Sequence, residues 1–230
     1  MNKLTCPWDQ FEPTTRQFCE AEMCQWIAKP AESWSNIGFV IIGIYLIKLA
    51  NKEKRKNLTL VGICSILVGL GSFIYHATAT RWGQILDVSA MMWLLSLPLV
   101  LNAGRLGYLA ENKIKLAYGI FSLISTIFVT FFTKWGIAYF GFFVAVGILS
   151  EGKLYQLAKI ESNLKVSYKP YIQLLATFAV AFTIWLTDTF KIICNPDNHI
   201  FNGHAAWHLL CAVAVYYMYA FYKQFPDLRD

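Results

Sequence analysis

The chain has 230 residues, of which 57% are hydrophobic and 15% are charged, and its mean hydropathy is +0.44. A water-soluble domain carries about 25% charged residues, so this composition excludes an ordinary soluble domain and favours a membrane protein. The net charge of +6 falls in loops between long apolar runs, which argues against a nucleic-acid-binding surface.

The N-terminal segment, residues 1–33, mixes acidic residues with Trp and Phe and has no apolar core of the signal-peptide type. We therefore expect it to precede a single membrane domain, residues 34–230. Seven apolar runs follow, and about 20 such residues cross a bilayer as a helix. The runs occupy roughly 34–50, 58–76, 85–101, 114–131, 136–150, 171–187 and 204–223. The sequence thus predicts an all-α bundle of seven transmembrane helices.

Basic residues are distributed unequally between the two sides of such a bundle. With seven spans, the N-terminus and every second loop lie on one side, which we call the N-side. The N-side holds six of the 20 Lys and Arg residues, and the other side holds the remaining 14, including "NKEKRK" after the first span. Cytoplasmic loops are enriched in Lys and Arg, so we expect an extracytoplasmic N-side and a cytoplasmic C-terminus.

Four of the six cysteines fall on the N-side, the side on which disulfides persist. They are Cys6, Cys19, Cys24 and Cys194, whereas Cys64 and Cys211 fall within spans. Four cysteines permit three pairings, and spacing does not choose between these pairings or decide against unpaired buried thiols.

Polar side chains gather at one level of the predicted bundle, the N-side ends of spans two, three, six and seven. They are Ser72, His76, Asp87, Asp188, His204 and His208. Residues four apart share a helix face, so His204 and His208 can bind one metal ion, and Ser72 lies on the same face as His76. Ionisable groups inside a membrane are costly and usually face a cavity, a partner or a metal. The shared level predicts a functional site.

Three neutral imidazoles are the ligand set of a catalytic zinc site that keeps a fourth position open. We therefore predict an intramembrane zinc site at His76, His204 and His208, with His199 outside it. Asp87 suits a general base, and Ser72 suits a hydrogen-bond donor to a developing oxyanion. The alternatives are that Asp87 orients a histidine and that Ser72 bonds its own helix backbone.

The motifs Ser-x-x-x-His, Asp at the start of span three and His-x-x-x-His resemble the CREST superfamily of seven-helix membrane hydrolases. Within it, "GSFIYHATATRWGQILDVSAMMWLL" and "HAAWHLL" are most similar to the alkaline ceramidases. The resemblance implies that zinc at the three histidines supports hydrolysis of the N-acyl bond of a ceramide-like membrane lipid, giving a fatty acid and a sphingoid base. An ester bond, as in the phospholipases of the superfamily, and a receptor-like role with structural zinc remain as alternatives.

The resemblance also implies a calcium site in the N-terminal segment, near the zinc. Glu20 and Glu22 match its acidic residues, and Glu32 lies near the position of a third ligand without aligning cleanly. Gln17 and Phe18 depart from the family, which tends to have Asp-Trp there. The alternative is that these glutamates form a solvated face.

The family links a cysteine of the N-terminal segment to one before span seven. These positions correspond to Cys19 and Cys194 here, which leaves Cys6 and Cys24 as a second pair. The sequence does not indicate oligomeric state, acyl-chain preference or source membrane.

Overall fold

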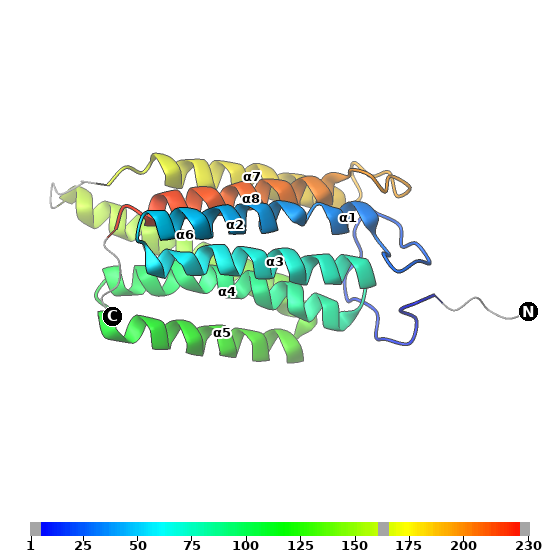
Figure 1. The fold of residues 1–230 in the computed structure, drawn as a ribbon, viewed down its shortest axis with the longest axis horizontal. Coiled ribbons are helices and arrows are strands. Elements are labelled where there is room, and N and C mark those ends of the chain that lie inside the picture. Colours follow the sequence, from blue (N-terminus) through cyan, green and yellow to red (C-terminus); the bar gives the residue numbers. More distant parts are fainter. Residues whose placement is uncertain (1–5, 161–165, 226–230) are drawn as a thin grey trace, which may run out of the picture.

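The fold is known from a computed structural model that describes residues 6–160 and 166–225. Within them, seven helical segments are long and apolar enough to cross a membrane, one for each span that the sequence predicts. The helices lie side by side, and the N-terminal segment and the α7–α8 connection lie at the same end of the bundle (Figure 1). Residues 1–5, 161–165 and 226–230, which belong to the two expected domains, lie outside the described residues.

The described chain contains eight α-helices joined in part by short 3-10 turns. The helices are α1 Pro30–Trp34, α2 Ile37–Lys52, α3 Thr59–Thr78, α4 Arg81–Arg105, α5 Ile114–Phe131, α6 Gly136–Ile160, α7 Lys169–Thr189 and α8 Gly203–Tyr222, and the turns are η1 Lys56–Leu58, η2 Glu111–Lys113 and η3 Thr133–Trp135.

Most spans extend beyond the apolar runs that predicted them. The first begins at Pro30, because proline favours the first position of a helix. Glu32, which was expected in the N-terminal segment 1–33, is therefore helical and belongs to the first span. The helix α6 continues to Ile160 beyond its apolar run, and the charge of Glu151 is paired there with Arg105 at 2.6 Å.

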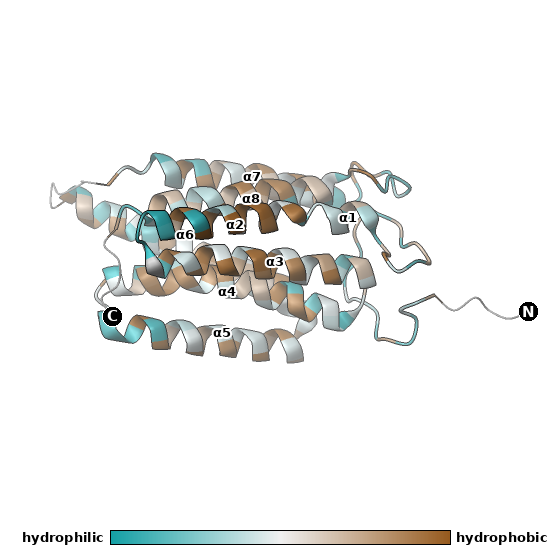
Figure 2. Cartoon of the chain, in the orientation of Figure 1, coloured by the Kyte–Doolittle hydropathy of each residue, from teal (hydrophilic) through white to brown (hydrophobic). Residues whose placement is uncertain are grey.

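Each helix of the bundle packs against particular neighbours. The helix α3 packs on α2 and α4, α4 packs on α5 and α6, and α8 packs on α2 and α7. Apolar residues fill the middle of the bundle, and hydrophilic residues gather toward its two ends (Figure 2), as expected of helices that cross a hydrocarbon layer.

The helices α2 and α3 cross with their backbones in close approach. A Cβ atom at Gly43 would lie 2.6 Å from the carbonyl oxygen of Gly62, and a Cβ at Gly62 would lie 2.6 Å from that of Gly43. Small residues permit such crossings between membrane helices. This contact sets the position of α3, which carries His76.

The N-terminal segment is fastened across one end of the bundle. Disulfides join Cys6 to Cys24 and Cys19 to Cys194, which confirms the pairing that the resemblance implied. Its backbone also bonds the α3–α4 turn, where Ala28 N donates to the carbonyl oxygen of Ala77 at 2.8 Å. The segment therefore covers the end of the bundle at which α3 ends and α4 and α8 begin.

Candidate metal centre

A tight turn between α3 and α4 brings together residues of both helices. The helix α3 ends at Ala79, whose φ of 51° is left-handed, and Thr80 then caps α4 by accepting a hydrogen bond from Gly83 N at 3.3 Å. Asp87 thus lies two turns into α4, where its backbone packs against Gly71 of α3, more than one turn before His76. Asn202 caps α8 in the same way, with a 2.8 Å bond from Ala205 N, and so fixes the start of the helix that carries the other two histidines.

The three predicted zinc ligands converge. One ring nitrogen from each of His76, His204 and His208 lies within 4.8 Å of those of the other two, and all three side chains are buried. Among the described residues, His76, His204 and His208 form the one group of three or more His, Cys, Asp or Glu side chains that could hold a metal ion.

Glu32 of α1 orients His76. Its carboxylate Oε2 lies 2.8 Å from Nδ1 of His76, and both side chains are buried. This contact favours a proton on Nδ1, which leaves Nε2 as a lone-pair donor toward the centre.

Ser35, three residues after Glu32, orients His208 in the same way. Its hydroxyl donates to the Glu32 carbonyl at 3.1 Å, so its oxygen accepts from Nδ1 of His208 at 2.9 Å. Nε2 of His208 then lies 3.5 Å from the hydroxyl of Ser72. One short helix therefore sets the ring orientation of two of the three histidines.

The donor atoms fit a metal ion that prefers nitrogen. Nε2 of His76 and Nδ1 of His204 are buried and have no hydrogen-bond partner among the described residues. Buried polar atoms are nearly always paired, so the two lone nitrogens beside a third imidazole match the needs of a cation. The set of three imidazoles without a thiolate matches a zinc site with an open position.

The N-terminal segment and α7 close the centre from the N-side. The ring of Phe18 lies 3.9 Å from that of His204, centre to centre. Asp188, at the end of α7, accepts hydrogen bonds from the backbone nitrogens of Cys19 and His204, each at 3.1 Å. Asp188 therefore joins three chain segments beside the centre and does not enter the histidine group.

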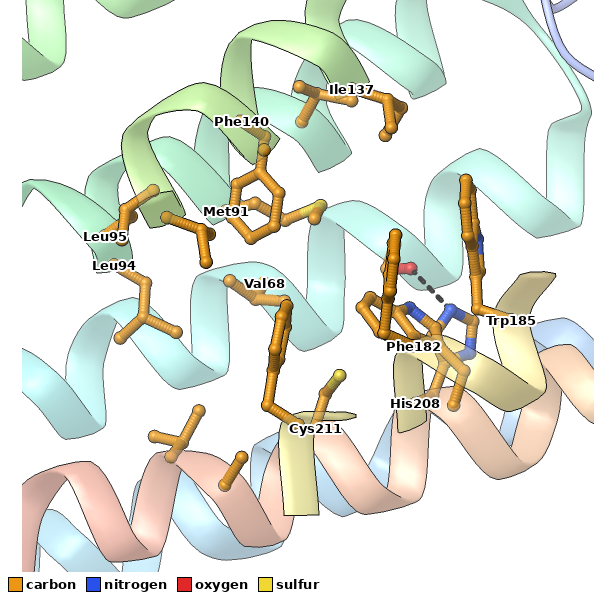
Figure 3. A pocket seen from close by; sticks show the side chains of 18 of the residues that line it. Val68, Met91, Leu94, Leu95, Ile137, Phe140, Phe182, Trp185, His208 and Cys211 are labelled. Carbon is orange, nitrogen blue, oxygen red and sulfur yellow. Dashed lines mark hydrogen bonds between the residues drawn. The ribbon is translucent and has the colours of Figure 1, made fainter. Parts of the chain in front are cut away.

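A largely apolar cavity of about 610 Å³ begins at the histidines and is lined by α3, α4, α6, α7 and α8. Ser72, Asp87, His204 and His208 line one end of it, and Tyr222, fourteen residues further along α8 than His208, lines the other. Ile137 and Phe140 of α6 and Phe182 and Trp185 of α7 lie on its walls, with His208 at the polar end (Figure 3).

Ser72 and Asp87 occupy the mouth of the histidine group, as predicted. Both are buried, with 2% and 8% of their surface exposed, and both line the cavity beside His204 and His208. The dashed line in Figure 3 marks the bond between Ser72 and His208. The two residues are thus placed to act on a group that enters the cavity.

The three glutamates of the expected calcium site do not form a comparable group. Glu20 is already an acceptor for four donors, namely Ala31 N, Glu32 N, His199 Nδ1 and Asn202 Nδ2. Glu22 is exposed, and Glu32 faces His76 and Lys29. The oxygens of Glu20 are engaged, whereas both carboxylate oxygens of Glu32 are buried without a hydrogen-bond partner among the described residues. A calcium site at these glutamates stays a prediction.

Sequence reasoning missed the roles of Glu32 and Ser35 next to the histidines. A usable signal was present, because Pro30 starts a helix on which positions 32 and 35 are three residues apart and share a face. It also missed the contact of His199 with Glu20, at 2.9 Å, for which the loop sequence gives no sign.

Seven apolar helices and a buried group of three histidines at the end of an apolar cavity define a multi-pass membrane protein with a metal-binding centre. Comparison with known families agrees, since the ceramidase family model matches residues 12–227. The chain belongs to the ceramidase family.

Its relatives are similar along most of their length. Alkaline ceramidase 1 of Homo sapiens is 25% identical over 220 residues, which covers 90% of this chain and 81% of the relative. The alkaline ceramidase of Drosophila melanogaster is 25% identical over 230 residues, covering 95% and 80%. An alkaline ceramidase of Saccharomyces cerevisiae is 25% identical over 233 residues, covering 89% and 74%.

Proposed function

We propose that this protein is an intramembrane zinc amidase that hydrolyses the N-acyl bond of ceramide-like lipids to a fatty acid and a sphingoid base. The observation that carries the proposal is the junction of a buried three-histidine group with a cavity lined largely by apolar residues. Membership of the ceramidase family supports ceramide as the substrate class.

His76, His204 and His208 would hold the zinc ion. Bound there, zinc activates water and polarises a carbonyl oxygen. Glu32 and Ser35 keep the rings of His76 and His208 turned toward the centre. Phe18 covers the ring of His204 and limits access of bulk water from the N-side.

Asp87 and Ser72 have different roles in the proposed reaction. Asp87 accepts a proton from the attacking water and returns it to the amide nitrogen as the C–N bond breaks and the sphingoid amine leaves, for which a carboxylate at the cavity mouth is suited. Ser72 donates a hydrogen bond to the carbonyl oxygen as negative charge develops on it. The acyl chain lies in the cavity, and we infer that the lipid enters from the membrane between α6 and α7.

We further propose that the N-terminal segment, the metal centre and the disulfides lie on the extracytoplasmic side and the C-terminus in the cytoplasm. The two disulfides at the N-side end support this, because disulfides persist outside the reducing cytoplasm. The division into a segment 1–33 and a membrane domain 34–230 is kept as part of the proposal, with the helix of the first span reaching back to Pro30.

The decisive experiment incubates purified protein with separate ceramides, phospholipids and simple acyl esters, with and without a zinc chelator. We expect chelator-sensitive release of fatty acid from ceramide, restored by added zinc. Release from esters alone would replace the amidase proposal with an esterase, and zinc binding with no release from any lipid would favour the receptor-like alternative.

A further inference from the structure

A buried lysine lies beside the metal centre, in the segment for which calcium was expected. Lys29 immediately precedes α1 and has 2% of its surface exposed. Burying an ammonium group is costly unless it is paired. Its surroundings therefore indicate what the charge does.

The ammonium of Lys29 is enclosed by groups that attract a cation. Nζ lies 3.8 Å from Oε2 of Glu32, donates to Oε1 of Gln17 at 3.5 Å and sits over the ring of Phe18 at 5.6 Å from its centre. A carboxylate, an amide oxygen and an aromatic face are each favourable neighbours of an ammonium ion.

The backbone of Lys29 is fixed against the helix that carries His76. Its N–H donates to the carbonyl of His76 at 3.2 Å, and its own carbonyl accepts from the Ser33 hydroxyl at 2.7 Å. Lys29 is therefore a buried residue with a fixed backbone, not a mobile surface lysine. It bears on the same carboxylate oxygen of Glu32 that contacts His76 at 2.8 Å.

The chain Lys29–Glu32–His76 links the N-terminal segment to a metal ligand. A buried carboxylate needs a favourable partner, and Nζ of Lys29, 3.8 Å from Oε2 of Glu32, is the cation that lies beside it. A calcium ion would meet Lys29 at this oxygen and would be repelled by it.

We propose that Lys29 is a positioning residue: it supplies from within the chain the positive charge that holds Glu32 against His76, so the cover of the metal centre is ordered without calcium. This inference deepens the proposed function, on which it rests for the role of His76.

The test uses zinc affinity and thermal melting of the purified full-length protein, neither of which requires substrate. In Lys29→Ala we expect zinc affinity to fall by about 10-fold or more, the effect of losing a partner of a metal ligand, and the melting temperature to fall by roughly 5 °C or more. Lys29→Arg should recover most of both. Lys223→Ala is the matched control, because it breaks the half-exposed pair with Glu53 and should leave zinc affinity unchanged.

Calcium provides the second measurement, made on the unmodified chain. Calcium chloride should raise the melting temperature of the zinc-loaded protein no more than magnesium chloride does. A calcium-specific rise would overturn the proposal, as would full zinc affinity in Lys29→Ala. Failure of the lipid assay with these results intact would refute only the proposed reaction.

Discussion

The three histidines of the centre are held by three different kinds of neighbour. Glu32 contacts Nδ1 of His76, Ser35 accepts from Nδ1 of His208, and the ring of Phe18 packs on His204. Partners of this sort fix the orientation and the protonated nitrogen of a metal-binding imidazole. Changes at the residue scale should therefore separate metal binding from chemistry.

Replacing any one histidine of the group should remove the metal. His76→Ala, His204→Ala or His208→Ala should each lose about one equivalent of zinc or bind it severely more weakly, since three ligands are the minimum for a stable site. Metal analysis of the purified variants checks this. His199→Ala is the control, because His199 contacts Glu20 and not the histidine group; full zinc content in His204→Ala would refute the site.

Ser35→Ala should weaken zinc binding by about 10-fold to 100-fold, because Nδ1 of His208 loses its acceptor. A competition titration against a chelator of known affinity measures the change. Ser65→Ala is a matched control, since Ser65 is equally buried but donates to the Phe39 carbonyl on another helix. Equal effects of the two variants would show that Ser35 acts only through general stability.

Asp87→Asn should keep the zinc but reduce hydrolysis by about 100-fold or more, because an amide cannot accept the proton of water. Ser72→Ala should cost up to about 100-fold, the loss of one hydrogen bond to the oxyanion. Initial rates on ceramide at matched zinc content measure both. Wild-type rates in Asp87→Asn would assign Asp87 a packing role.

At the scale of elements, helix α1 is short but determines much of the centre. The seven spans could be predicted because long apolar runs are a strong signal, and the histidines could be grouped because their spans end on the same side. The apolar runs alone did not assign Glu32 and Ser35, because the start of a helix is marked here by Pro30 and not by hydrophobicity. The pairing of Glu20 with the loop before α8 depends on how the chain closes at that end, which no local pattern encodes.

The crossing of α2 and α3 gives a prediction about stability. Gly43→Ala should destabilise the protein by about 1–3 kcal/mol, because the added methyl group would lie 2.6 Å from the Gly62 carbonyl oxygen. Gly119→Ala on α5 has open space around the new atom and should be neutral or slightly stabilising. Thermal melting in detergent compares the two, and equal melting temperatures would contradict the close crossing.

On the scale of the whole molecule, we expect the depth of the cavity to limit the length of the acyl chain that the protein can hold. Ala214 lines the cavity and lies six residues beyond His208 on α8, about 9 Å along the helix axis. Ala214→Phe should block the deeper part, so that hydrolysis of long-chain ceramides falls while short-chain ceramides are still cleaved.

A panel of ceramides that differ only in acyl length measures this preference. Val213→Phe is the matched control. Val213 is next to Ala214 in the sequence, but its side chain is 40% exposed and is not among the residues that line the cavity. An unchanged chain-length profile in Ala214→Phe would place the acyl chain outside this cavity.

The disulfide between Cys19 and Cys194 joins residues 175 positions apart, and this has a consequence for biogenesis. In the proposed orientation Cys19 would be exported with the first span, yet its partner follows α7 and emerges only after six spans have been inserted into the membrane. The N-terminal segment therefore cannot be joined to the α7–α8 connection until that connection has been synthesised, and oxidation of this pair becomes a late step. A chain stalled before Cys194 would leave the Cys19 thiol without its partner, so a free thiol at that position would mark an unfinished molecule.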